Sequence, residues 1–131
     1  MNGNYLISGF ADEIAQDLTT QLESLKKLNM QYMEMRGVDG NNLIYHTPEK
    51  VQEIKKRLDD AGISLSAIGS PLGKIGIDEE FTPHFEDFKR AVDIAHKVET
   101  KNIRMFSFYM PVGRVKGYKN QVFERVGQFV D

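Results

Sequence analysis

The chain repeats one pattern four times: a short run of apolar or β-prone residues is followed by a longer segment with helical spacing. The short runs span residues 5–10, 31–38, 63–69 and 102–109. Strands that alternate with helices in this way predict right-handed βαβ units and a parallel sheet. The repeat therefore restricts the fold to the α/β class.

The segments after these runs carry apolar residues every three or four positions, which predicts helices. In the first segment these residues are Ile14, Leu18, Leu22, Leu25 and Leu28. The second helix has the clearest ends, because Thr47 can cap it, Pro48 suits its first position and Gly62 can end it. The third is expected at about residues 83–98 with Thr82 as its cap, and the last from about residue 118 onward.

Two architectures are built from such units. An open, doubly wound sheet of about five strands suits a chain of 131 residues. A barrel of eight strands typically needs about 250 residues, so four units would form half of one.

The alternation of side chains along the runs favours the barrel, because central strands of an open sheet are almost continuously apolar. In the second run Tyr32, Glu34 and Arg36 share one face, and Met33 and Met35 the other. The third run places Ser64, Ser66 and Ile68 opposite Ile63, Leu65 and Ala67, and the fourth places Arg104, Phe106 and Phe108 opposite Ile103, Met105 and Ser107. The apolar face of these strands suits packing against helices, and the charged face suits a barrel interior. The alternative for any one strand is that it lies at the edge of a sheet with one face in solvent.

Composition excludes several classes of function. Seventeen basic and nineteen acidic residues leave a net charge of -2, so no global field favours nucleic acid or an anionic membrane. The chain has no cysteine, which excludes disulfides, zinc ribbons and thiol nucleophiles. Its apolar runs are too short to span a membrane, and residues 1–5 lack the order of a signal peptide. We expect a cytoplasmic protein with one domain over residues 1–131.

Four segments, Gly9-Phe10-Ala11-Asp12-Glu13-Ile14, residues 32–36, residues 66–75 and residues 103–109, resemble the xylose isomerase-like TIM barrel superfamily. More narrowly, they are similar to its bacterial sugar phosphate isomerase/epimerase proteins. The most specific parts are Gly-Ser-Pro-Leu-Gly-Lys at residues 69–74 and Arg-Met-Phe-Ser-Phe-Tyr at residues 104–109, whereas Glu-x-Arg at residues 34–36 is weak alone.

The resemblance implies an α/β fold of parallel β/α units, with four of the eight units of a TIM barrel present. The chain would then be the N-terminal half of such a barrel. A half barrel exposes a sheet edge and apolar surface, and both promote association. We therefore expect a homo-oligomer or a missing C-terminal half as the partner.

The implied function is that of a sugar (phosphate) isomerase/epimerase, an enzyme that moves a proton on a small-molecule sugar with the help of a metal. The implied cofactor is a divalent ion (Mn, Mg or Zn). Its ligands are expected on the last four strands, outside this chain. The fragment alone is accordingly expected to be inactive, and no catalytic residue or metal ligand is assigned to it.

Active sites of these barrels lie at the carboxyl ends of the strands. The substrate-binding candidates are Phe10, Glu34, Arg36, Ser70, Lys74 and Tyr109. Phe10 could stack on a sugar or plug the barrel. Glu34, Arg36 and Arg104 could form an ion-pair network that fixes the strands, or Arg36 could bind a carboxylate or phosphate. Lys74 is expected near an anionic substrate.

The three histidines show no metal-ligand spacing. We expect His84 and His96 on the surface of the third helix, and His46 in a loop on the functional face.

The sequence leaves two other functions as alternatives. An abasic-site endonuclease of the same superfamily needs histidine-rich strand ends and basic loops, which the sequence lacks. The other alternative is a non-catalytic flavodoxin-like binding or receiver module. A flavodoxin needs a Ser/Thr/Gly-rich loop after the first strand, which is missing. A receiver needs acidic residues after the first strand and an aspartate after the third. Asp12 and Glu13 meet the first need, but the third run ends in Ser70-Pro71. Residues 69–75 also depart from a nucleotide phosphate loop in their spacing.

Overall fold

The computed structural model describes residues 3–131 and consists of parallel β/α units. Its helices are α1 (Leu18–Lys27), α2 (Pro48–Ala61), α3 (Thr82–Lys97) and α4 (Lys119–Val130), with 3-10 turns η1 (Ala11–Glu13), η2 (Leu43–Tyr45) and η3 (Val115–Tyr118). Strands β1 (Tyr32–Met35), β4 (Ser64–Gly69) and β5 (Ile103–Arg104) form a parallel sheet in the order β1-β4-β5. Strands β2 (Gly37–Val38) and β3 (Asn41–Asn42) pair as a short antiparallel hairpin.

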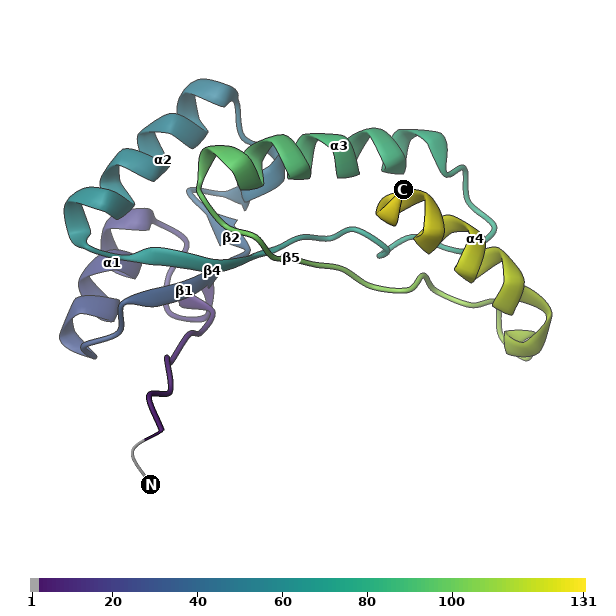
Figure 1. The fold of residues 1–131 in the computed structure, drawn as a ribbon, viewed down its shortest axis with the longest axis horizontal. Helices are drawn as coiled ribbons and strands as arrows, with labels where there is room; N and C mark the ends of the chain where they lie inside the picture. Colours follow the sequence, from purple (N-terminus) through teal and green to yellow (C-terminus); the bar gives the residue numbers. More distant parts are fainter. Residues whose placement is uncertain (1–2) are drawn as a thin grey trace.

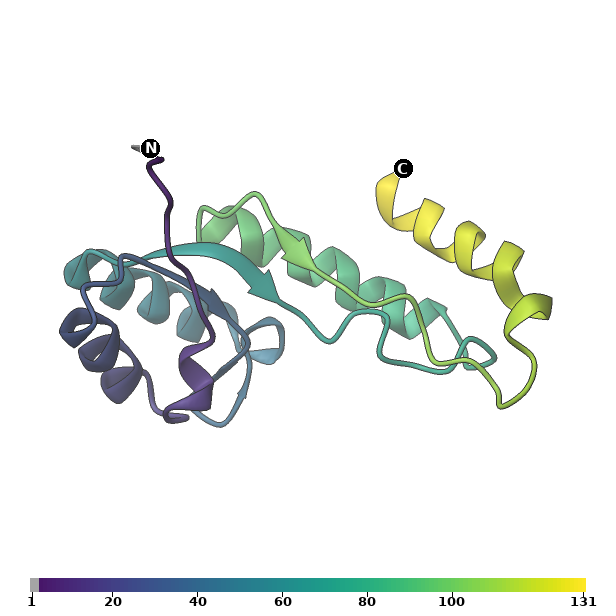
Figure 2. The same cartoon turned by 90° about the horizontal axis from the view of Figure 1, so that it is seen from below.

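The sheet order follows the chain order, and a helix joins each pair of neighbouring strands. Figure 1 shows α2 and α3 on one side of the sheet, and Figure 2, seen from below, shows the strands in front of these helices. Helices α2 and α3 thus cover the same face of the sheet. This arrangement is that of a barrel wall and differs from a doubly wound sheet, which carries helices on both faces.

The ends of α2 are those predicted from the sequence. The Thr47 hydroxyl accepts a hydrogen bond from the Lys50 N–H at 3.2 Å, Pro48 occupies the first turn, and Gly62 ends the helix with φ 69°. In α1 the carboxylate of Asp17 caps the helix by accepting from Thr20 N–H at 2.8 Å. Ile14 therefore lies before the helix, although the apolar spacing had included it.

The cap predicted for α3 is wrong. The residue before the first turn is Phe81, no side chain caps the helix, and Thr82 already belongs to it. Phe81 instead packs its ring against that of Phe85, with centroids 5.8 Å apart. An aromatic contact thus fixes the start of α3 in place of a side-chain cap.

The first predicted strand, residues 5–10, is extended but is not a strand of the sheet. The Glu34 N–H donates to the Gly9 carbonyl at 3.0 Å, and the hydroxyls of Ser8 and Ser66 lie 2.6 Å apart. Tyr5 and Leu6 are 85% and 70% exposed. Figure 1 shows this segment leaving the sheet on the side opposite α2 and α3. Its hydrogen bonding at β1 is too sparse to form a ladder.

A bulge in β4 changes the predicted side-chain pattern. Met33 pairs with Leu65, but Glu34 pairs with Ala67 and Met35 with Ile68, so the register shifts by one residue at Ser66. An extra residue in one strand moves the following side chains to the other face. The prediction that Ile68 shares a face with Ser66 is therefore wrong, and Ile68 is fully buried.

The fourth predicted run forms a regular strand only at β5. Beyond it the chain pairs with the loop after β4: Phe106 N–H donates to the Leu72 carbonyl at 2.7 Å, and Phe108 N–H donates to the Gly73 carbonyl at 2.9 Å. Phe108 has φ 74° and Gly73 has φ 82°. These left-handed backbone conformations interrupt regular pairing between the two segments. A side chain at Gly73 would collide with the Phe106 carbonyl, so glycine is required there.

Two apolar clusters hold these elements together. The first lies between the sheet and helices α1 to α3 and includes Met33, Met35 and Ile68. The second fixes α4 and contains Ile77, Phe108 and Phe129. No helix within residues 3–131 combines the length and apolar character that a membrane crossing requires.

Candidate functional site

A hollow of about 440 Å³ opens where β1 and β4 end, beside the β2–β3 hairpin. The polar side chains that line it include Asp12, Arg36, Asn42, Ser70, Lys74 and Arg104. These residues come from five separate stretches of the chain. The parallel strands bring them together because their carboxyl ends meet at one edge of the sheet.

Arg36, directly after β1, binds the 3-10 turn η1. Its Nε lies 3.0 and 3.1 Å from the two carboxylate oxygens of Asp12, and its Nη2 lies 2.9 Å from Asp12 and 2.6 Å from Glu13. Its guanidinium carbon lies 4.1 Å from the centre of the Phe10 ring. These hydrogen bonds, the one to Asp12 foremost, raise the pKa of Arg36. Arg36 therefore fixes residues 10–13 to the end of β1.

Arg104, at the end of β5, forms a second and separate ion pair. Its Nε lies 2.7 Å from the Glu34 carboxylate, and its guanidinium faces the rings of Phe106 and Phe10 at 4.8 and 5.7 Å. The predicted network of Glu34, Arg36 and Arg104 is therefore divided: Glu34 pairs with Arg104. Arg36 pairs with Asp12 and Glu13 instead. Gly69 lies between the two arginines, and a side chain there would meet both of them and Glu34.

Ser70 and Asn42 use polar atoms to hold the backbone around the hollow. The Ser70 hydroxyl donates to the Arg104 carbonyl at 2.5 Å and accepts from Leu72 N–H at 3.3 Å. The Asn42 amide donates to the Gly69 carbonyl at 3.1 Å. Asn42 had not been identified from the sequence, where its hairpin appears only as a turn.

Lys74 is the cation of the hollow that has no carboxylate partner among residues 3–131. Its ammonium lies 4.6 Å from the centre of the Phe106 ring, and its side chain is exposed. The two arginines, by contrast, are neutralised locally by Asp12, Glu13 and Glu34. Lys74 is thus the group best suited to attract an anion into the hollow.

The structure brings together part of the predicted substrate-binding set. Arg36, Ser70 and Lys74 line the hollow, and Phe10 and Glu34 contact its arginines. Tyr109 is 61% exposed, pairs through its backbone with Gly76, and is not among the residues that line the hollow. Asp12, which pairs with Arg36, was missed as a site residue because the two lie 24 positions apart.

The histidines differ from expectation at one position. His84, predicted on the surface, is only 7% exposed, and its Nε2 accepts a hydrogen bond from Gly73 N–H at 2.6 Å. Burial lowers the pKa of His84. His96 is exposed, and His46 places its Nε2 2.5 Å from the Val38 carbonyl without lining the hollow.

Residues 3–131 contain no group of three or more His, Asp or Glu side chains arranged to hold a metal ion. The residues present therefore do not fit the divalent ion that the resemblance implies. We derive no chemical step through a metal from this chain.

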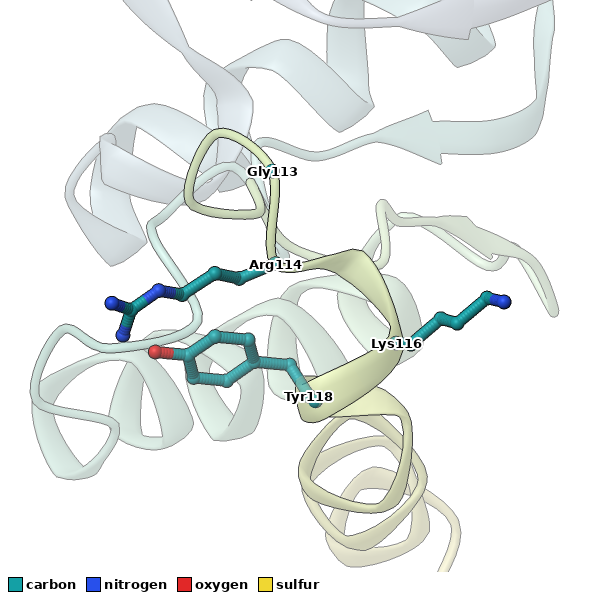
Figure 3. Close-up of a pocket in the computed structure, with 5 residues that line it drawn as sticks. Gly113, Arg114, Lys116 and Tyr118 are labelled. Carbon is teal, nitrogen blue, oxygen red and sulfur yellow. The ribbon is translucent and has the colours of Figure 1, made fainter.

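A larger hollow of about 660 Å³ lies in the segment before α4. Figure 3 shows the side chains of Arg114 and Tyr118 lying side by side and that of Lys116 pointing away from them. All five lining residues belong to residues 113–118, and none is a carboxylate. The smaller hollow is the better candidate site, because several strand ends contribute to it.

Comparisons with known proteins give a likeness to solved structures. No family model and no curated protein sequence matches the chain. Among solved structures, D-psicose 3-epimerase in the presence of D-fructose is similar with a TM-score of 0.60 at 18% sequence identity. The match covers 91% of this chain and 45% of that enzyme, so the chain spans less than half of its length. This likeness confirms the predicted fold class: the chain has the α/β fold of parallel β/α units that form part of a TIM barrel.

Proposed function

We propose that the chain forms one half of the substrate-binding wall of a sugar isomerase or epimerase, and that the hollow at the strand ends binds a sugar phosphate. The observation that supports this most is the convergence of Arg36, Lys74 and Arg104 at the carboxyl ends of parallel strands. The fold, shared with part of a sugar epimerase, agrees with it.

The side chains suit the two chemical parts of such a substrate. A guanidinium carries five N–H donors, and Arg104 uses its Nε–H on Glu34, which leaves donors for sugar hydroxyls. The Lys74 ammonium suits a phosphate, since a charge-assisted hydrogen bond is stronger than a neutral one. The exposed part of the Phe10 ring offers an apolar surface for the face of a sugar.

The chemical step is proposed to need more than this chain. The described residues hold no metal cluster, and the carboxylates at the hollow are bound to arginines. We propose that the groups that move the proton, and the ligands of a divalent ion, belong to further β/α units that complete the barrel. The 45% coverage of the epimerase leaves room for such units.

Calorimetric titration of the chain with D-fructose 6-phosphate and with D-fructose tests this assignment. The change Lys74→Met should raise the Kd for the phosphorylated sugar by roughly tenfold, because one charge-assisted contact is lost. The Kd for D-fructose should change little.

The matched control is Lys101→Met, which removes an exposed lysine outside the hollow. It should leave both dissociation constants unchanged. Equal effects of the two substitutions, or equal binding of both sugars by the parent chain, would contradict a phosphate site at Lys74.

A further inference from the structure

His84 lies buried at the start of α3 inside the second apolar cluster. The centre of its ring is 6.3 Å from that of Phe108 and 6.4 Å from that of Phe129. Its Nε2 accepts the hydrogen bond from Gly73 N–H at 2.6 Å. A neutral imidazole accepts at one nitrogen only, so its proton must lie on Nδ1.

Gly73 lies at the centre of the loop after β4, residues 70–76, which reaches the hollow. Ser70 and Lys74, on either side of Gly73, line the hollow. Gly73 has φ 82° and lies against the Phe106 backbone. The backbone conformation of the loop is therefore restricted at this residue. A change at the Gly73 amide would therefore alter the direction of the neighbouring Lys74.

We infer that His84 is a positioning residue: as a neutral acceptor it holds Gly73, and so presents Lys74 to the hollow, whereas as a cation it releases the loop. A protonated imidazole has two N–H donors and no acceptor, so it cannot keep the bond to the Gly73 amide. The importance of the loop for binding rests on the proposed function; its coupling to His84 does not.

Burial in the cluster favours the neutral ring. Burial is the main cause of the lowered pKa of His84; of the charged groups near it, Asp87 and then Glu79 oppose this effect, and Arg125 on α4 adds to it. Arg125 is held over the Phe81 ring at 5.1 Å and donates to the Glu79 carbonyl at 2.8 Å. Protonation would thus place a second positive charge in the same cluster.

Amide hydrogen exchange of the isotope-labelled chain, followed by NMR from about pH 8 to about pH 5, tests the coupling. After correction for the intrinsic exchange rate, protection of the Gly73 amide should fall by up to about tenfold as His84 titrates. The Ile63 amide, bonded to the Leu58 carbonyl in the first cluster, should keep its protection. The His84 ring resonances report the titration in the same samples.

Two substitutions separate the acceptor from the charge. His84→Gln keeps an acceptor oxygen that cannot titrate in this range, so protection at Gly73 should remain and lose its pH dependence. His84→Leu removes the acceptor and should lower protection of Gly73 at every pH.

The inference would be overturned if hydrogen-exchange protection of the Gly73 amide did not change as His84 titrates. An unchanged pH dependence of this protection in His84→Gln would also overturn it. If His84→Leu unfolds, the comparison of His84→Gln with the parent chain still decides. These measurements need no sugar, so a failure of the sugar-phosphate proposal at Lys74 is recognised separately.

Discussion

Arg36 is a candidate for substrate binding from the sequence, but in the structure it forms an ion pair with Asp12. The sequence suggested that it either fixes strands or binds an anion, and its bidentate pair with Asp12 shows that it fixes η1. The side chains of Arg36 and Asp12 are 30% and 13% exposed, so the pair is partly shielded from water. An unpaired Asp12 carboxylate in that setting would be unfavourable.

Arg36→Met should therefore lower the free energy of unfolding by about 1 to 2 kcal/mol, less than for a fully buried pair because solvent screens part of the interaction. Urea unfolding followed by circular dichroism measures this. The control Arg90→Met changes an arginine whose side chain is 55% exposed, and its effect should stay within about 0.5 kcal/mol. An unchanged unfolding midpoint together with weaker sugar binding would instead assign Arg36 to the substrate.

The sequence identified most of the charged residues of the site and grouped Arg104 with its partner Glu34, but it did not identify the partner of Arg36. Arg36 and Arg104 could be chosen because charges on the inner face of a strand need a charged partner or a ligand, and Lys74 because it lies in the loop after a strand end. The pairing of Arg36 with Asp12 depends on how η1 folds back onto β1, and no local pattern encodes that contact. His84 was predicted on the surface because a polar residue in the first turn of a helix is usually exposed.

At the scale of elements, local signals predicted α2 well, while the sheet depended on contacts between distant residues. The capping threonine, the proline and the final glycine of α2 act within a few residues of one another. The bulge at Ser66 and the irregular pairing after β5 arise from neighbouring strands and loops. Residues 5–10 have the composition of a strand, but β1 gives them too few hydrogen bonds to become one.

Thr47→Ala should reduce the free energy of unfolding by about 1 kcal/mol, because the Lys50 N–H loses its side-chain acceptor. Thr82→Ala is the matched control at α3, where no side chain caps the helix, and should change stability by a few tenths of a kcal/mol at most. Denaturation of both variants under identical conditions makes the comparison. Equal losses would show that Thr82 also acts as a cap in solution.

At the scale of the whole molecule, the chain has a one-sided layer of helices on a sheet with open edges. Within residues 3–131, β5 pairs with a strand on one side only, and residues 5–7, in the segment that leaves the sheet, expose large apolar side chains. Unpaired strand edges and exposed apolar groups promote association between chains. The match covers 45% of the epimerase, which agrees with the proposal that further β/α units complete the wall.

Analytical ultracentrifugation should therefore show a weight-average mass that rises above that of one chain as the concentration increases. Leu6→Lys, which adds a charge to a residue that is 70% exposed, should shift this association to higher concentration without reducing stability. A constant monomer mass over the whole range would contradict an association-prone edge.

The most direct test of a substrate wall at the strand ends is a chemical-shift map of the isotope-labelled chain during titration with D-fructose 6-phosphate. The largest amide shifts are predicted in residues 36–42 and 69–74, the two segments that line most of the hollow. Shifts confined to residues 113–118, where the larger hollow lies, or spread over the outer faces of the helices would contradict the proposed site.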